Sequence, residues 1–319
     1  MTHRSTAARV IYLGGLGRSG TTLLERLLGE IPGVAPLGEV VHLWARGVLA
    51  GEPCGCGAPF PACPFWREVG ETAFGGWTPA LAERVLALRH RVDRTRRIPY
   101  ITHALRHRVD PARRIPHITH PDLAEYAATY RRLYDAAAVT AGATAVVDSG
   151  KHASLAFCLA AAGVDLHVVH VVRDPRAVAH SWRKTVARPE DGNPMTRWGP
   201  ARTAAHWTAQ NLALDLLAAR GVRVTRLRYE DLLADPAAAL AALAGILGLA
   251  TTLPFLTGTT ARLTTAHTAS GNPMRFTVGP VELRRDDSWR SGLPRLHQRL
   301  VTALTWPLRL RYGYGEAVA

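Results

Sequence analysis

The chain has 319 residues, 47% of them hydrophobic, and its mean hydropathy is close to zero. Such a chain can bury a large core, which excludes a disordered protein and a small disulfide-stapled one. The formal net charge of +14 would ordinarily suggest a polyanionic partner, but residues 84–114 alone hold ten arginines against two aspartates. The rest of the chain is only mildly basic, so we expect no nucleic-acid partner. The length allows one large domain or two small ones, and alternating strand and helix patterns favour a single α/β domain over residues 1–319.

The sequence shows no membrane or secretory signal. No apolar run approaches the roughly 20 residues that cross a bilayer, and the apolar stretch near the start of the chain is too short for a signal peptide. We therefore expect a cytoplasmic protein with no membrane partner.

Predicted strands and helices alternate along the chain. Residues 9–15 form a β-branched run that ends in glycine, and leucines at helical spacing follow over residues 21–31. Further strands are predicted over residues 144–148, 166–173 and 222–229, and helices over 123–141, 155–162, 176–186, 201–220 and 237–247. This order predicts a P-loop-like parallel sheet with helices on both faces, which binds ligands at the carboxyl ends of its strands.

The glycine-rich segment between the first strand and the first helix is a candidate anion-binding loop. Its glycines let the backbone curl so that amides and a helix N-terminus point at the ligand. The candidate ligand-binding residues are Arg18, Ser19, Gly20, Thr21 and Thr22. A Walker loop has a lysine where Thr21 stands. The cation is instead Arg18, which suits a donor whose leaving group is a 5′-phosphate.

Three cysteines cluster in the segment PCGCGAPFPAC, at Cys54, Cys56 and Cys63. Three thiols plus a fourth ligand from elsewhere in the chain could hold zinc, but the spacing matches no standard zinc finger. We interpret them as packing thiols in a turn-rich loop and expect no metal.

Residues 87–103 are followed at once by a near copy over residues 104–120, with 14 of 17 positions identical. Two copies are too few for a solenoid. We interpret residues 87–120 as a duplicated surface helix and loop inserted in the domain. The alternative is a basic arm that grips an anionic substrate or partner.

Two motifs together resemble one enzyme family. GRSGTTLL, from Gly17 to Leu24, resembles the 5′-phosphosulfate loop of sulfotransferases that use 3′-phosphoadenosine-5′-phosphosulfate, and is most similar to the tyrosylprotein branch. VVHVVRDPRAVAHSW resembles their 3′-phosphate motif, in which a strand is followed by Arg173 and, eight residues later, by Ser181. The resemblance extends from Val10 to about Pro294. It implies that 3′-phosphoadenosine-5′-phosphosulfate is the co-substrate, that a small-molecule or side-chain hydroxyl is the acceptor, and that no metal is required.

Further segments resemble the family more loosely. Tyr229, after a later strand, would touch the adenine side, although it is equally suited to the core. Residues 270–294 resemble the C-terminal loop that closes over the nucleotide, with Asn272 and Arg275 as candidate contacts. A lysine often precedes the tryptophan of that loop, where this chain has Ser288, and we interpret Arg275 as the replacement cation.

Glu39 is the candidate general base. It lies 21 residues after Arg18, the offset found in the tyrosylprotein branch. Independently, a helix from Gly20 to Glu30 carries the chain about 16 Å away from the phosphate, and five extended residues return about 16 Å. Glu39 should therefore lie level with the loop. The alternative is that Glu39 caps the next helix, and His42 is the reserve base.

Lys151 is one of only two lysines in the chain and follows a predicted strand end in the segment VDSGKHA. This segment resembles a lysine-bearing segment on the active-site side of the family, so we expect Lys151 near the sulfonate. The alternative is a solvated surface lysine. Together, Arg18, Lys151 and the loop amides would stabilise the transferred group while Glu39 takes the acceptor proton.

Two other functions fit parts of the pattern. A P-loop small-molecule kinase shares the strand, loop and helix but needs the missing lysine and a magnesium site. A non-enzymatic polyanion-binding protein would use the basic residues 84–114.

Overall fold

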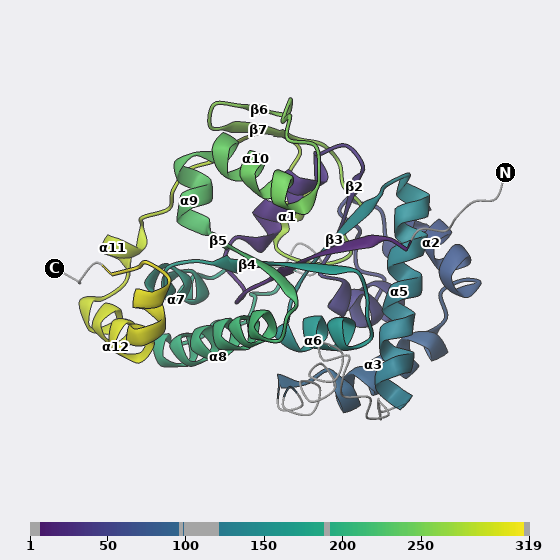
Figure 1. The fold of residues 1–319 in the computed structure, drawn as a ribbon, viewed down its shortest axis with the longest axis horizontal. Helices are drawn as coiled ribbons and strands as arrows, with labels where there is room; N and C mark the ends of the chain where they lie inside the picture. The colour runs from purple at the N-terminus through teal and green to yellow at the C-terminus, as the bar shows by residue number, and fades with distance from the viewer. Residues whose placement is uncertain (1–6, 96–97, 99–120, 188–191, 316–319) are drawn as a thin grey trace.

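The computed structural model describes residues 7–95, 98, 121–187 and 192–315 (Figure 1). Most of the duplicated segment therefore lies outside the described residues. Its first residues, from Ala87 to Val92, form the last turns of helix α3 (Pro79–Val92). None of the helices in the described part of the chain is long and apolar enough to span a bilayer.

The centre of the molecule is a five-stranded sheet in the order β2-β3-β1-β4-β5, and every pairing is parallel. The strands are β1 (Arg9–Gly14), β2 (Val34–Gly38), β3 (Ala145–Lys151), β4 (Leu166–Val172) and β5 (Arg223–Arg228). The central strands are apolar along both faces because both faces are covered. The predicted α/β fold is confirmed.

Two apolar clusters fill the space above and below the sheet. Alternate residues of β1 face opposite ways, so Ile11 packs in one cluster and Tyr12 in the other. The first cluster joins the sheet to α1 (Thr21–Gly29), α9 (Tyr229–Ala234) and α10 (Pro236–Leu247). The second joins it to α5 (Pro121–Ala141), α6 (Ala153–Ala161) and α8 (Pro200–Ala219). Figure 1 shows the two groups on opposite sides of the sheet.

The remaining elements flank this frame. At one end of the sheet, α7 (Pro175–Arg183) packs with α8, α11 (Trp289–Gly292) and α12 (Arg295–Arg311), whereas α2 (Pro64–Phe74) and α3 pack with α5. Three short antiparallel strands form a second sheet: β6 (Leu256–Thr257), β7 (Thr260–Leu263) and β8 (Gly279–Glu282). Single-turn elements are η1 (Val40–His42), η3 (Phe60–Ala62) and η5 (Pro273–Phe276), and Leu43–Leu49 forms the π-helix η2.

Two boundaries differ from the sequence prediction in ways that affect the site. The strand predicted over residues 144–148 runs on to Lys151, which places that lysine at the very end of β3. The helix predicted over residues 176–186 ends at Arg183, because Lys184 is already extended.

Candidate nucleotide and transfer site

The glycine-rich loop lies between the carboxyl end of β1 and the start of α1. Gly20 occupies the N-cap position of α1 with a left-handed φ of 94°, and its side-chain-free Cα faces the ring of Tyr229. Ser19 and Thr21 are buried beside it. No described side chain caps α1, so its first amides keep their donors for a ligand. This is the arrangement that binds phosphate groups.

Arg18 lies in this loop with an unusual backbone. Its φ of 76° is in the left-handed region, which a non-glycine residue rarely occupies. The guanidinium lies 5.6 Å from the ring centroid of Trp182, and its Nη2 is 3.5 Å from Met195 Sδ. Burial lowers the pKa of Arg18, and the Glu39 carboxylate opposes this effect. Trp182 and Met195 therefore position the Arg18 guanidinium, and the negative charge of Glu39 interacts with it.

Arg173 joins the segment after β4 to the glycine-rich loop. Its Nη1 donates to the backbone carbonyl of Arg18 at 3.2 Å, and its guanidinium carbon lies 4.6 Å from the ring centroid of Tyr229. Its Nη2 also pairs with Asp286 at 3.4 Å. The two segments predicted to hold opposite ends of one nucleotide therefore meet at Arg173, together with Tyr229.

Helix α7 begins at this arginine. Asp174 is its N-cap and accepts from the amide of Arg176 at 2.8 Å, and Pro175 is the first helical residue. In the last turn of α7, Trp182 Nε1 donates to the carbonyl of Gly17 at 2.9 Å. Ser181, next to Trp182, is half-buried on this helix. Helix α7 therefore contacts the glycine-rich loop directly.

Glu39 and Lys151 form an ion pair through Glu39 Oε1 and Lys151 Nζ, and each side chain is 15% exposed. Glu39 follows β2 and Lys151 ends β3, so the two neighbouring parallel strands deliver them to the same edge of the sheet. Lys151 has a φ of 67°, a second left-handed non-glycine residue. His42 Nε2 lies 3.6 Å from Glu39 Oε2.

The charge state of this cluster follows from its surroundings. Burial alone would raise the pKa of Glu39, but the positive charges of Lys151 and Arg46 hold it below its ordinary value. Burial also lowers the pKa of His42, against the attraction of Glu39, so His42 is neutral at pH 7. Glu39 stands at the N-cap position of η1, yet its side chain makes no capping bond there. The carboxylate instead faces the lysine.

Three acceptors fix the backbone around Glu39. Buried Glu25 accepts from the amide of Gly38 at 2.5 Å, the carbonyl of Ser270 accepts from the amide of Glu39 at 3.1 Å, and Asp148 accepts from that of Val40 at 3.4 Å. Sequence reasoning missed these partners. The only local signal was an acidic residue among the leucines of α1, at a position on its buried face.

The other predicted contacts lie elsewhere or have a local role. Asn272 caps η5 by accepting from the amide of Met274 at 3.1 Å. The buried Arg275 guanidinium donates to the carbonyls of Pro53 at 2.8 Å and Thr268 at 3.1 Å. These bonds join Arg275 to the cysteine-bearing segment, so we do not include it in the proposed nucleotide site.

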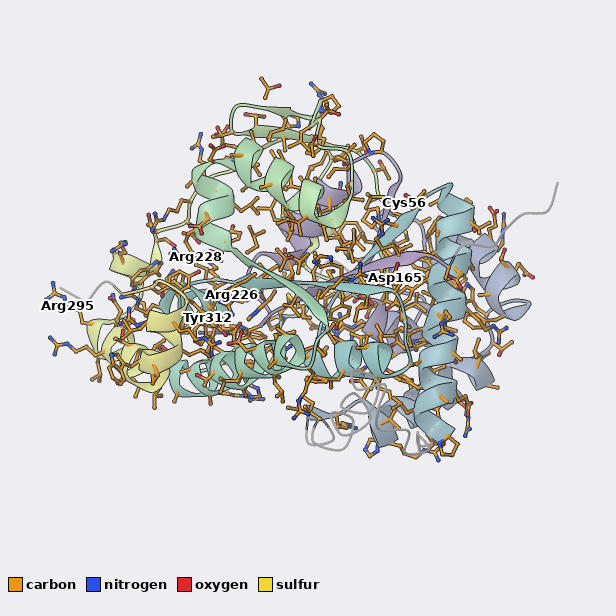
Figure 2. The ribbon with its side chains drawn as sticks, in the orientation of Figure 1. Cys56, Asp165, Arg226, Arg228, Arg295 and Tyr312 are labelled. Carbon is orange, nitrogen blue, oxygen red and sulfur yellow. The ribbon has the colours of Figure 1, made fainter. Side chains whose placement is uncertain are left out.

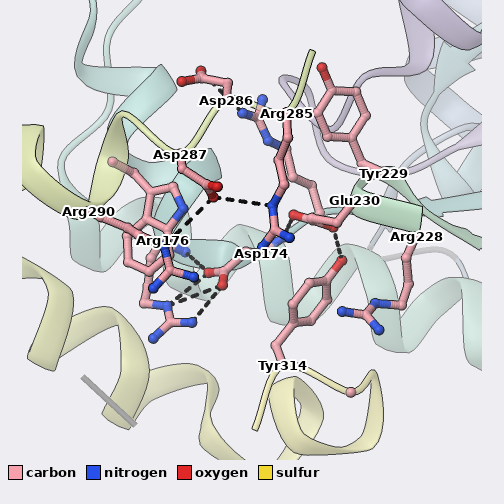
Figure 3. Close-up of a pocket in the computed structure, with 13 residues that line it drawn as sticks. Asp174, Arg176, Arg228, Tyr229, Glu230, Arg285, Asp286, Asp287, Arg290 and Tyr314 are labelled. Carbon is pink, nitrogen blue, oxygen red and sulfur yellow. Dashed lines mark hydrogen bonds and ion pairs between the residues drawn. The ribbon is translucent and has the colours of Figure 1, made fainter. Parts of the chain in front are cut away.

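A cavity of about 180 Å³ opens beside Arg173 (Figure 3). Its wall contains five arginines and three aromatic rings, and Figure 3 shows Glu230 hydrogen-bonded to Tyr314 on one side. Lining residues include Arg173, Asp174, Arg176, Tyr229, Asp286 and Trp289. Glu39 and Lys151 do not line it, so the cavity belongs to the Arg173 end of the site.

The fold and this geometry define an α/β protein with a candidate anion-binding site at the carboxyl ends of parallel strands. Residues 68–252, more than half of the chain, match the model of the sulfotransferase family. The chain belongs to that family. The matched region contains Lys151, Arg173 and Ser181, and it begins after the glycine-rich loop and Glu39.

Solved structures give similar proteins. The sulfotransferase domain of the olefin synthase of Synechococcus PCC 7002 is 20% identical, with a TM-score of 0.48 over 97% of this chain and 96% of that one. Sulfotransferase STF1 of Mycobacterium tuberculosis is 18% identical, with a TM-score of 0.42 over 77% and 69%. STF9 of Mycobacterium avium is 13% identical, with a TM-score of 0.42 over 77% and 65%. No curated protein matches the chain.

Proposed function

We propose that the protein transfers a sulfuryl group from 3′-phosphoadenosine-5′-phosphosulfate to an acceptor hydroxyl, with Glu39 as general base. The observation that carries the proposal is the contact of Arg173 with both the carbonyl of Arg18 and the ring of Tyr229. It brings two phosphate-binding segments together, as a nucleotide with phosphates at two positions requires. The family match supports the reaction class.

The two segments bind different ends of the nucleotide. The loop amides, Arg18, Ser19, Thr21 and Thr22 bind the 5′-phosphosulfate, because a helix N-terminus and hydroxyl donors suit an anion. Arg173 and Ser181 bind the 3′-phosphate, since a guanidinium makes short, charge-assisted bonds to phosphate oxygens. Tyr229 lies between the two and offers a ring face to the adenosine.

The transfer itself is in line. The acceptor oxygen bonds to sulfur, the bond from sulfur to the 5′-phosphate oxygen breaks, and the leaving group is adenosine 3′,5′-bisphosphate. The acceptor proton goes to Glu39, which is ionised because the charge of Lys151 holds its pKa below the ordinary value. Lys151 supplies a compact positive charge at the same edge of the sheet, where negative charge develops on the transferred group.

Two variants separate binding from chemistry. Glu39→Gln should bind adenosine 3′,5′-bisphosphate normally but lose about 100-fold or more in turnover, the usual contribution of a general base. Arg173→Ala should mainly weaken nucleotide binding. Glu71→Gln, on the exposed face of α2, is the matched control and should change neither. Titration calorimetry and turnover with a panel of hydroxyl acceptors measure both effects, and undiminished turnover in Glu39→Gln would refute the base.

A binding test distinguishes the kinase alternative. Adenosine 3′,5′-bisphosphate should raise the melting temperature without magnesium, because the proposed site uses arginine and amides. ATP with magnesium should raise it only if the protein is a kinase, and Thr21 stands where a kinase of this type needs lysine.

A further inference from the structure

Four residues with soft or imidazole ligand atoms meet outside the transfer site. Cys54, Cys56 and Cys63 come from the segment between η2 and α2, and His267 comes from the segment before η5, 204 residues after Cys63. Cys54 and Cys63 are fully buried. Figure 2 places Cys56 on the side of the molecule away from Arg228 and Tyr312, so the cluster is separate from the cavity of Figure 3.

The distances among these atoms fit the edges of a tetrahedron around one ion. His267 Nδ1 lies 3.3 Å from Cys63 Sγ and 3.7 Å from Cys54 Sγ, and the sulfurs of Cys56 and Cys63 are 3.8 Å apart. All four ligand atoms lie within 4.8 Å of one another. Zinc bonds of about 2.3 Å to sulfur and about 2.0 Å to nitrogen give tetrahedral edges of about 3.8 Å between sulfurs and about 3.5 Å between sulfur and nitrogen.

Backbone hydrogen bonds and close contacts fix the segments that carry the four residues. The amide of Gly57 donates to the carbonyl of Cys54 and the amide of Cys54 donates to that of Ala58, both at 2.8 Å. A Cβ on Gly55 would lie 2.5 Å from the carbonyl of Ala266, so glycine is needed where the two segments touch. The ring of Phe65 stacks on that of His267, with the ring centroids 5.1 Å apart. These contacts orient the thiols and the imidazole toward one point.

We propose that Cys54, Cys56, Cys63 and His267 bind a structural Zn²⁺ ion. The donor set of three thiolates and one imidazole suits zinc, and four protein ligands leave no open position for a substrate. The sequence analysis interpreted the cysteines as packing thiols because it could not identify a fourth ligand. His267, which supplies that ligand, is distant from them in the sequence. The proposal does not depend on the sulfuryl-transfer function.

Arg275 acquires a role in this site. Three thiolates around a divalent ion leave a net charge of about −1. The guanidinium donates to the carbonyl of Pro53, next to Cys54, and to that of Thr268, next to His267. Arg275 therefore bridges the two ligand-bearing segments and offsets the residual charge.

The ion would also brace the backbone behind Glu39. The segment that carries His267 continues to Ala269, whose amide donates to the carbonyl of Leu37 at 2.8 Å, and to Ser270, whose carbonyl accepts from the amide of Glu39. Zinc binding thus fastens the cysteine loop to the strand end that presents Glu39. We expect the metal to stabilise the protein as a whole.

The first test is the metal content of the full chain. Protein purified from zinc-supplemented cells should contain about one zinc per chain by plasma mass spectrometry. Cys56→Ser should reduce this to a small fraction. Cys158→Ser is the matched control, because Cys158 is the remaining cysteine and lies in α6, and it should retain the metal. Parent protein without zinc, or Cys56→Ser with undiminished zinc, would overturn the site.

Cobalt spectroscopy tests the site without any variant. Parent protein exchanged into Co²⁺ should show thiolate charge-transfer bands and the intense visible bands of tetrahedral cobalt, and added Zn²⁺ should abolish them. Weak octahedral bands would overturn the proposal. So would peptide mapping that finds Cys56 and Cys63 joined as a disulfide in the purified protein.

Discussion

At the scale of single residues, Arg18 and Lys151 have the same conformational peculiarity. They are the two non-glycine residues with positive φ in the described part of the chain. A left-handed conformation costs about 1–2 kcal/mol for an L-residue with a side chain. Strain of this kind concentrates at functional sites, where neighbouring structure enforces it. The backbone thus singles out the two cations that the sequence analysis assigned to the transferred group.

Buried Glu25 should make the stability of the fold depend on pH. Burial raises its pKa to about 8, from an ordinary 4.5, although Ser149 and the amide of Gly38 donate to it. The native state therefore keeps a proton that the unfolded chain loses above about pH 4.5. Its stabilising contribution is complete below that pH and is lost as the pH rises through 8. Asp148 acts in the same direction, since burial raises its pKa to about 7.

Replacing Glu25 by glutamine should flatten this dependence. A glutamine carbonyl can still accept from the amide of Gly38, but it has no proton to lose. We expect the free energy of unfolding of the parent to fall by a few kcal/mol more than that of Glu25→Gln between about pH 5 and pH 8.5. Urea unfolding of both proteins across this range measures the difference. Parallel curves would show that Glu25 is already ionised in the native protein.

Among the elements, the junction of β1 and α1 has no room for a side chain at Gly20. Gly20 has a left-handed φ, and a Cβ there would lie 2.2 Å from a ring carbon of Tyr229. Gly20→Ala therefore forces either the ring or the loop to move. We expect a loss of about 2–4 kcal/mol in unfolding free energy, together with weakened nucleotide binding.

The control for this variant is Gly142→Ala. Gly142 also has a left-handed φ, of 59°, but an added Cβ would meet nothing within 4 Å. The unfolding free energy of Gly142→Ala should fall by only about 1 kcal/mol, the cost of a left-handed alanine, and its nucleotide affinity should be unchanged. Urea unfolding and calorimetric titration compare the two. Equal losses would mean that contact with Tyr229 does not matter at Gly20.

The elements that sequence reasoning found are those with a strong periodic signal. Strands β1 and β4 are apolar on both faces, and the leucine pattern of α1 ends at a proline and a glycine. The second sheet was missed because β6, β7 and β8 have only two to four residues each. Helix α12 was missed because Pro307 interrupts its interior. Short or interrupted elements depend on tertiary contacts that no local window contains.

The same distinction applies to the site. Arg18, Arg173 and Glu39 could be proposed from the sequence because each lies within a motif or at a fixed distance from one. Glu25 and His267 were not, because their partners lie on other segments of the chain. What the sequence could not predict is which distant segments the fold brings together.

For the molecule as a whole, the duplicated segment offers a test of how much of the chain the fold requires. Arg91 Nη1 at the end of α3 pairs with Asp122 Oδ2 at the start of α5 at 3.3 Å, and Tyr126 donates to Asp93 at 2.8 Å. These contacts join the end of α3, which lies within the first copy, to α5, which follows the second copy. Removing residues 104–120 leaves eleven residues, 93–103, which reach about 35 Å when extended. That length is ample for the connection.

We expect the chain lacking residues 104–120 to fold, to bind adenosine 3′,5′-bisphosphate with unchanged affinity and to keep its turnover. It should bind heparin more weakly and with a shallower salt dependence, because the deleted copy carries four arginines against one aspartate. Thermal unfolding, calorimetry and salt-gradient elution from heparin measure the three properties. Lost turnover with intact nucleotide binding would instead assign the basic segment to the acceptor, because the proposed nucleotide site at the strand ends includes no residues for the acceptor.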